Sequence, residues 1–316
     1  MTADDAIALI EAAADPRTLF GRDPGRDPGR DYRRLARLTH PDAHPGSSRA
    51  AAAFAKLAEL WQRYRTGLGP LVAGGDIANL YEHERGLLKL ARDPADNDLL
   101  DREAGALTRL HTGGDSRYLP YIPSLISAEL HQDPASGIRR RANVISRLEG
   151  FVPLAAVHAA YPRGLDPRDV AWMWRRLLVA IGFAHRAGVI HAAVLPSHVL
   201  IHPAAHGLVL VDWCYSISKP AATLAAVPTS HAAWYPDEAL SRRFAGPDLD
   251  IYLATRCMTQ LLAGRAPRQL AAFARGCTLP GSARRPQDAW RLLGELDDVL
   301  GRLYGPRKFR PFAMPA

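Results

Sequence analysis

The chain has 316 residues, of which 47% are hydrophobic and 23% charged, and its formal net charge is +8. These values are ordinary for a globular protein and predict one large domain or two smaller ones. No apolar run approaches the roughly 18 residues of a membrane span, which argues against a membrane protein. The three cysteines, Cys214, Cys257 and Cys277, are odd in number and widely spaced, so we expect reduced thiols in a cytoplasmic protein.

The positive charge raises the question of nucleic acid as a partner. The arginines are scattered, however, and no aromatic residues interleave with a basic stripe as a single-strand binder would need. An excess of arginine is also typical of a GC-rich bacterial genome. We therefore expect neither nucleic acid nor a membrane as a partner.

Residues 1–66 predict three helices. Apolar residues recur at helical spacing in 4–14 and again from about 48 to 64, and a basic helix covers 31–39. Two copies of Arg-Asp-Pro-Gly between Gly21 and Gly29 predict turns. The basic helix stops at His40-Pro41-Asp42, because proline disfavours helix at the residue before it. Ser47 or Ser48 can cap the third helix.

This segment resembles the J-domain of DnaJ-type co-chaperones, through Tyr32, Leu35, His40-Pro41-Asp42 and Phe54. The resemblance implies two antiparallel helices, with the His-Pro-Asp loop between them contacting a DnaK-type ATPase. Basic residues of the preceding helix would steer this contact with an acidic partner; they are Arg33, Arg34 and Arg37. The alternative is that His40-Pro41-Asp42 is only a helix stop with an Asx-type turn.

From about residue 68 the pattern changes. Residues 71–81 predict a strand, a glycine turn and a second strand, and 86–91 predict a third. Residues 96–110 predict a helix with its leucines on one face. A strand over 141–148 and a strongly apolar helix over 169–185 follow.

The stretch from His191 to Leu200 and the buried strand that ends at Asp212 resemble the catalytic loop and the DFG site of protein kinases. The kinase pattern is H-R-D-L-x-x-x-N followed by D-F-G. Here Ala193 takes the place of the base, His198 that of the metal-binding asparagine, and Cys214 that of the glycine. An alanine methyl cannot accept a proton from a substrate hydroxyl. The resemblance therefore implies a degenerate site in which His191 supports the loop but no conventional catalytic residue remains.

Upstream, Lys89 and Glu103 match the strand lysine and the helix acid that pair in kinases. Gly74-Gly75 is what remains of the glycine-rich loop, whose backbone N–H groups approach phosphate. With Asp212, these residues imply ATP as cofactor together with Mg²⁺ or Mn²⁺. His198 as a second metal ligand suits Zn²⁺ or Mn²⁺ better than Mg²⁺. The alternative is an ordinary surface lysine at a strand end and an exposed helix acid.

Three later motifs match structural parts of kinases. Tyr235-Pro236-Asp237-Glu238 matches the APE motif, Asp250-Ile251-Tyr252 the start of helix F, and Arg285-Pro286 the late arginine motif. The resemblance implies that Asp250 holds the backbone of the catalytic loop. It also implies that Glu238 and Arg285 form a buried ion pair.

A cluster of histidines offers a zinc site as an alternative: His191, His198, His202 and His206. The pattern lacks a cysteine pair and an H-E-x-x-H helix, which counts against it. We expect His202 and His206 to lie in a solvent-exposed hairpin turn.

The sequence thus predicts an α+β protein with a small helical J-domain-like hairpin (1–66), a bilobal protein-kinase-like domain (67–305) and a basic C-terminal tail (306–316). We expect the tail to be a loose basic end; the alternative is that it docks on the kinase-like domain or on a partner. The predicted function is that of a co-chaperone or adaptor: the His-Pro-Asp loop recruits a DnaK-type chaperone, and a catalytically impaired kinase domain binds an unknown client or senses nucleotide. One alternative is an atypical enzyme that transfers a phosphoryl or nucleotidyl group from ATP with Lys89 and Asp212. Another is a scaffold that binds no nucleotide.

Overall fold

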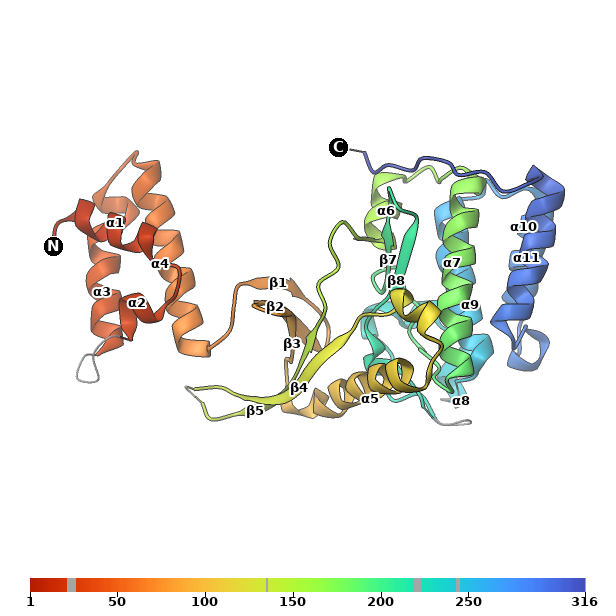
Figure 1. Ribbon diagram of the computed structural model, residues 1–316, viewed down its shortest axis with the longest axis horizontal. Coiled ribbons are helices and arrows are strands. Elements are labelled where there is room, and N and C mark those ends of the chain that lie inside the picture. Colours follow the sequence, from red (N-terminus) through yellow and green to blue (C-terminus); the bar gives the residue numbers. More distant parts are fainter. Residues whose placement is uncertain (22–26, 135, 219–222, 243–244, 316) are drawn as a thin grey trace. The chain divides into compact units, whose positions relative to one another are not determined.

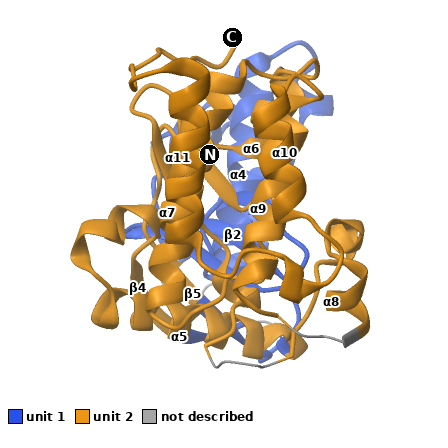
Figure 2. Cartoon of the chain, turned by 90° about the vertical axis from the view of Figure 1, so that its right-hand side faces the viewer, with its two compact units in different colours: residues 1–94, 129–142 blue, residues 95–128, 143–316 orange. Residues whose placement is uncertain are grey.

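The computed structural model describes residues 1–316 apart from 22–26, 135, 219–222, 243–244 and 316. The chain divides into two compact units, which Figure 2 shows in different colours. Unit 1 comprises residues 1–94 and 129–142, and unit 2 comprises residues 95–128 and 143–316. They are described one after the other.

Unit 1 begins with a group of helices (Figure 1): α1 (Ala3–Ala12), α2 (Arg17–Phe20), α3 (Pro28–Thr39), the 3-10 helix η1 (Pro41–Ala43) and α4 (Ser48–Thr66). Helices α1, α3 and α4 pack against one another around a shared apolar core. Aromatic rings extend this core, since Tyr32 stacks on Trp61 at 4.8 Å between ring centroids and Phe20 meets Trp61 edge-on at 5.1 Å. The predicted helices are therefore confirmed, and α2 is added to them.

The start of α3 corrects one sequence prediction. The Asp27 carboxylate accepts a hydrogen bond from the Gly29 N–H at 2.9 Å, and Pro28 is the first helical residue. The second Arg-Asp-Pro-Gly copy is thus a helix start instead of a turn, while residues 22–26, which hold the first copy, lie outside the described residues. Helix α4 is capped by Ser47 and ends at Gly67, whose φ of 68° suits glycine.

The strands form an antiparallel meander followed by a second hairpin. The order in the five-stranded sheet is β1-β2-β3-β5-β4, with β1 Leu71–Gly74, β2 Ala78–His83, β3 Gly86–Ala91, β4 Leu125–Gln132 and β5 Arg139–Ile145. The boundary between the units runs through β4 and β5, and unit 1 takes residues 129–142 of this hairpin.

Unit 2 is mostly helical. Its helices are α5 (Asn97–Gly113), α6 (Leu154–Ala160), α7 (Pro167–Arg186), α8 (Asp237–Arg242), α9 (Pro247–Leu262), α10 (Arg268–Cys277) and α11 (Ala289–Tyr304). A small sheet has the order β6-β7-β8, with β6 Val152–Pro153, β7 Val199–His202 and β8 Gly207–Leu210. Short 3-10 helices include η3 (Ser116–Tyr121), η4 (Trp213–Tyr215) and η5 (Thr229–Trp234).

Helix α7 is the centre of unit 2 and packs against both α9 and α11 (Figure 1). Its apolar residues are almost entirely buried, and Trp174 is 0% exposed. This burial accounts for the strong apolar character that predicted the helix, because a helix covered on several sides lacks a wide polar face.

The C-terminal tail packs on unit 2, so the prediction of a loose end is wrong. Phe312 is 8% exposed, and its ring lies 5.9 Å from Tyr161 and 6.2 Å from Trp172. The Tyr161 hydroxyl donates to the Ala313 carbonyl at 2.6 Å. Two aromatic contacts and a hydrogen bond therefore hold a segment that carries no helix or strand.

His206 corrects a third prediction, because it is buried where an exposed turn was expected. Its ring stacks on Trp172 at 4.1 Å and lies 4.4 Å from Phe309 of the tail. The tail thus covers the β7–β8 turn.

The three cysteines are buried and form no disulfide. Burial raises the pKa of Cys277 to about 11 and also raises that of Cys257. None of the helices in the described ranges combines the length and apolar character needed to cross a membrane.

Candidate functional site

The loop that joins α7 to β7 is held by one buried carboxylate. Asp250, in the first turn of α9, is 0% exposed. Its Oδ2 accepts from the His191 N–H at 2.8 Å and its Oδ1 from the Ala192 N–H at 2.7 Å. The His185 Nε2 lies 2.9 Å from the same Oδ2. Asp250 thus gives two buried backbone donors a charged acceptor, which fixes the shape of the loop.

The ring of His191 supports the same loop from inside. Its Nδ1 accepts from the Ala193 N–H at 3.2 Å, and its Nε2 lies 3.0 Å from the Val211 carbonyl. These contacts assign the proton to Nε2. Burial lowers the pKa of His191 to about 4, so the imidazole is neutral at pH 7. His191 is therefore a structural residue that links the loop to the strand before Asp212.

Ala193, at the position of the kinase base, is 0% exposed. The preceding Ala192 has a φ of 62°, and its carbonyl accepts from the Tyr235 hydroxyl at 2.9 Å. The loop is therefore held at Ala192 through both its N–H and its carbonyl group, and the side chain of the next residue, Ala193, is a methyl group. No proton acceptor is present at this position.

His198 bridges the loop and Asp212. Its Nδ1 lies 2.9 Å from the Ala193 carbonyl, and its Nε2 lies 3.0 Å from Asp212 Oδ2. A carbonyl and a carboxylate are both acceptors, so a hydrogen bond at either contact requires a proton on that nitrogen of His198. His198 therefore faces Asp212 as a hydrogen-bond donor in this arrangement, and a metal ion on that oxygen would have to replace this contact.

Asp212 lies in a group of potential metal ligands with Glu103 and Cys214. The three ligand atoms lie within 4.8 Å of one another. Glu103 is 1% exposed and accepts from Asn143 Nδ2 at 3.0 Å, and Asp212 has a φ of 65°. Carboxylate oxygens suit Mg²⁺ or Mn²⁺, whereas a thiolate suits zinc and other softer metals. The donor set therefore fits a divalent cation without selecting one.

The four histidines of the zinc alternative lie apart. His191 and His198 are 6.4 Å apart between ring centroids, His202 packs edge-on against Phe151, and His206 stacks on Trp172. Among the described residues, no group of potential metal ligands includes these histidines.

Glu238 of α8 and Arg285 form an ion pair. The Arg285 side chain is 1% exposed, its Nε lies 3.4 Å from Asp248 Oδ2, and its guanidinium lies 4.9 Å from the centre of the Tyr252 ring. Burial raises the pKa of Asp248 and lowers that of Arg285. Asp248 is thus a second acidic partner of Arg285, which was not predicted from the sequence.

In unit 1, Lys89 occupies the middle of β3 opposite Leu80 and is 7% exposed. Gly74 ends β1, and Gly75 donates its N–H to the Ala78 carbonyl at 2.9 Å. A Cβ added at Gly75 would lie 2.8 Å from that oxygen. The tight turn alone therefore requires glycine at this position.

His40-Pro41-Asp42 forms the turn between α3 and α4. The His40 Nδ1 accepts from the Asp42 N–H at 3.3 Å, and the His40 ring packs edge-on against Phe54 at 5.2 Å. The His40 and Asp42 side chains are 47% and 91% exposed. Three arginines of α3 are exposed as well: Arg33, Arg34 and Arg37.

Sequence reasoning missed several partners of the predicted residues. Asn143 binds Glu103, His185 binds Asp250, and the Tyr235 hydroxyl reaches Ala192. Only Tyr235 carried a signal, because it stands directly before the Pro-Asp-Glu of the predicted activation-segment end.

Together, the β7–β8 hairpin, the Asp250-anchored loop and the long central helix define a protein-kinase-like fold. Among solved structures, 1986 chains match this one. A crystal structure of the BubR1 kinase domain has a TM-score of 0.57 at 18% sequence identity, covering 74% of this chain and 80% of that one. No protein-family model and no curated protein matches the chain. Likeness at this identity shows the fold alone.

Proposed function

We propose that the protein is a J-domain co-chaperone or adaptor. In this proposal the His40-Pro41-Asp42 loop recruits a DnaK-type chaperone, and the kinase-like domain is a binding or nucleotide-sensing module for a protein client. The observation that carries the proposal is an exposed His-Pro-Asp turn in a chain whose kinase-like loop has Ala193 in place of the base.

The geometry of the turn supports recognition by a partner. The His40 ring is held by Phe54 and by the Asp42 N–H, so the tripeptide is ordered before binding and loses little conformational freedom. The exposed arginines of α3 precede it and would attract an acidic surface. Arg33 is the least free of them, since it lies 3.3 Å from Asp27.

The experiment is a single-turnover ATPase assay of a DnaK-type chaperone with the full chain. We expect stimulation by the wild type and loss of stimulation in His40→Gln. The matched control is His44→Gln in the same loop, because His44 contacts the Leu38 carbonyl at 2.8 Å and a glutamine amide can still donate there. Absence of stimulation by the wild type, or equal stimulation by His40→Gln, would refute the proposal.

The second candidate is an atypical transferase that moves a phosphoryl or nucleotidyl group from ATP with Lys89 and Asp212. It is favoured by the ligand group of Glu103, Asp212 and Cys214, in which Asp212 is partly exposed, because positioning and metal ions supply most phosphoryl-transfer catalysis. Bound ATP would bring the reactive phosphates, with Mg²⁺ or Mn²⁺ held by Asp212.

A thermal-shift titration with ATP, with and without Mg²⁺ or Mn²⁺, separates these functions. A ligand that binds only the folded state raises the midpoint. We expect a nucleotide-sensing or transferase site to give a shift that Lys89→Ala removes, and only a transferase to transfer radiolabel that Asp212→Ala abolishes. No shift at millimolar ATP would leave a scaffold that binds no nucleotide.

A further inference from the structure

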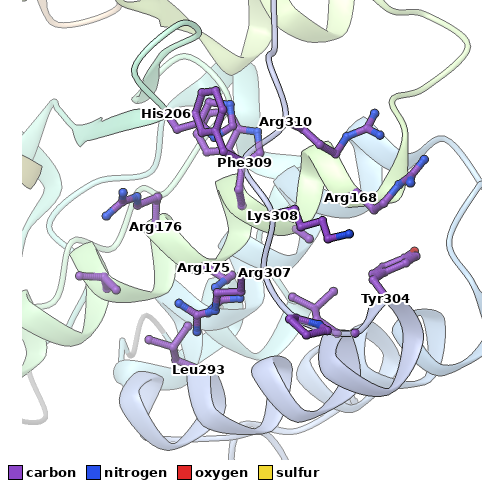
Figure 3. A pocket seen from close by; sticks show the side chains of 16 residues that line it. Arg168, Arg175, Arg176, His206, Leu293, Tyr304, Arg307, Lys308, Phe309 and Arg310 are labelled. Atoms are coloured by element: carbon purple, nitrogen blue, oxygen red, sulfur yellow. The ribbon is translucent and has the colours of Figure 1, made fainter.

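A basic cavity of about 680 Å³ lies on unit 2 (Figure 3), and its lining includes no residue of the Asp250-anchored loop. Helices α7 and α11, the β7–β8 turn and the C-terminal tail form its walls. Its volume is within the range of small-molecule sites. Six cationic side chains line it: Arg168, Arg175, Arg176, Arg307, Lys308 and Arg310.

Two of these arginines share two carboxylates at the start of α7. Arg168 pairs with Asp166 at 2.7 Å, and Arg310 lies 3.1 Å from Asp169 and 3.5 Å from Asp166. Arg168 and Arg310 are 48% and 39% exposed, so both still face solvent. This end of the cavity is close to neutral but rich in hydrogen-bond donors.

The remaining cations give the cavity excess positive charge. Arg175 pairs with Asp297 at 2.7 Å, and Arg307 pairs with the same carboxylate. Within the described ranges, the hydrogen-bond partner of Arg176 is the Tyr121 hydroxyl, at 2.7 Å. Among the residues that the structure describes, neither Arg176 nor Lys308 has a carboxylate within ion-pair distance. The six cations therefore face three carboxylates.

The indole of Trp172 and the rings of His206 and Phe309 complete the lining. The Trp172 Nε1 and the His206 Nε2 are buried without a hydrogen-bond partner in the described part of the chain. An indole N–H can only donate. Burial lowers the pKa of His206, so its ring is neutral at pH 7 and stacks without adding charge. Phe309, which covers His206, is 68% exposed.

We propose that this cavity binds a small molecule that carries several phosphate groups. Arginine and lysine around a bounded volume suit phosphate oxygens, because each charge-assisted bond is stronger than a neutral one. The unpaired charge of Arg176 and Lys308 gives the site its preference for a multiply charged anion over a singly charged one. The bounded volume of about 680 Å³ favours a compact ligand over an extended nucleic-acid strand.

Isothermal titration calorimetry of the full chain with tripolyphosphate and with inositol hexakisphosphate tests this proposal. We expect binding at one site that weakens with added salt. The double variant Arg176→Gln, Lys308→Gln leaves no carboxylate unpaired, and it should raise Kd by roughly tenfold or more, as the loss of two charge-assisted contacts implies. The matched control is Arg268→Gln, Arg291→Gln, which removes two exposed arginines outside the cavity and should leave Kd unchanged.

Localisation distinguishes this site from any nucleotide site. Binding should persist in Lys89→Ala, and it should shift the indole N–H resonance of Trp172, assigned from Trp172→Phe. The proposal is overturned by any of three results: no binding by the wild type, equal binding by the double variant and the control, or loss of binding in Lys89→Ala. Tighter binding of a phosphopeptide than of either small anion would likewise overturn the assignment to a small molecule.

Discussion

Replacing Asp250 by asparagine should destabilise unit 2 by about 3–5 kcal/mol. The carboxylate is fully buried and serves the backbone N–H groups of His191 and Ala192 together with the His185 ring. An asparagine has the same shape, but it offers one oxygen where the carboxylate offers two. The change therefore probes hydrogen bonding with little effect on packing.

The magnitude follows from the best orientation of the new amide. With its oxygen at the Oδ2 position, asparagine keeps the contacts from His191 and His185. The Ala192 N–H then faces an NH₂ group and stays buried without an acceptor, at a cost of about 1–3 kcal/mol. The two remaining bonds lose a charged acceptor, which costs about 1 kcal/mol each.

Urea unfolding followed by tryptophan fluorescence measures this loss, because Trp61 is the only tryptophan outside unit 2. The control is Asp298→Asn on α11, whose exposed carboxylate has no hydrogen-bond partner among the described residues, and which should change the free energy of unfolding by less than about 0.5 kcal/mol. A loss below about 1 kcal/mol in Asp250→Asn would refute the reasoning that this carboxylate holds the loop.

Three further changes test other contacts. The pKa of His191 falls from about 6.5 in the unfolded chain to about 4 in the folded one, so the unfolded state binds more protons between pH 4 and 6.5. Acidification from pH 6.5 to 4 should therefore lower the free energy of unfolding of the wild type by about 3 kcal/mol, and His191→Asn should lack this loss. Parallel pH profiles of the two proteins would contradict this. Phe312→Ala should lower the free energy of unfolding by about 2–4 kcal/mol, whereas Phe309→Ala, at a ring that is 68% exposed, should cost less than about 1 kcal/mol; equal losses would argue against docking of the tail. Arg285→Ala should cost about 3–5 kcal/mol in urea unfolding, because it leaves two carboxylates facing each other; a loss within about 0.5 kcal/mol would contradict a buried ion network.

The elements that could be predicted from sequence are those with strong local patterns. The apolar spacing of α4 and α7 and the glycine turn between β1 and β2 are visible in short windows. The likeness to a kinase fold was predicted from motifs such as the one at Asp250. This acidic residue lies in the first turn of a helix and holds the loop at His191 and Ala192, which precedes it in the sequence.

What the sequence could not predict depends on contacts between distant segments. His206 lies in a short turn between two strands, and nothing near it in the sequence indicates that Phe309 covers it. The pairing of Asn143 with Glu103 is equally hidden, because an asparagine in a strand has no characteristic spacing to its partner. The error at Asp27-Pro28 has a different origin, since the same residues favour both turns and helix starts.

The burial of all three cysteines has a practical consequence. Burial raises the pKa of the Cys257 and Cys277 thiols, which leaves little thiolate to react with alkylating reagents. A maleimide should therefore label a single cysteine introduced on the surface in strong preference to the three native thiols. A spin label at Ala313, which is exposed and does not line the cavity, could then report whether the tail is docked or released while the cavity is titrated, with the native thiols left in place.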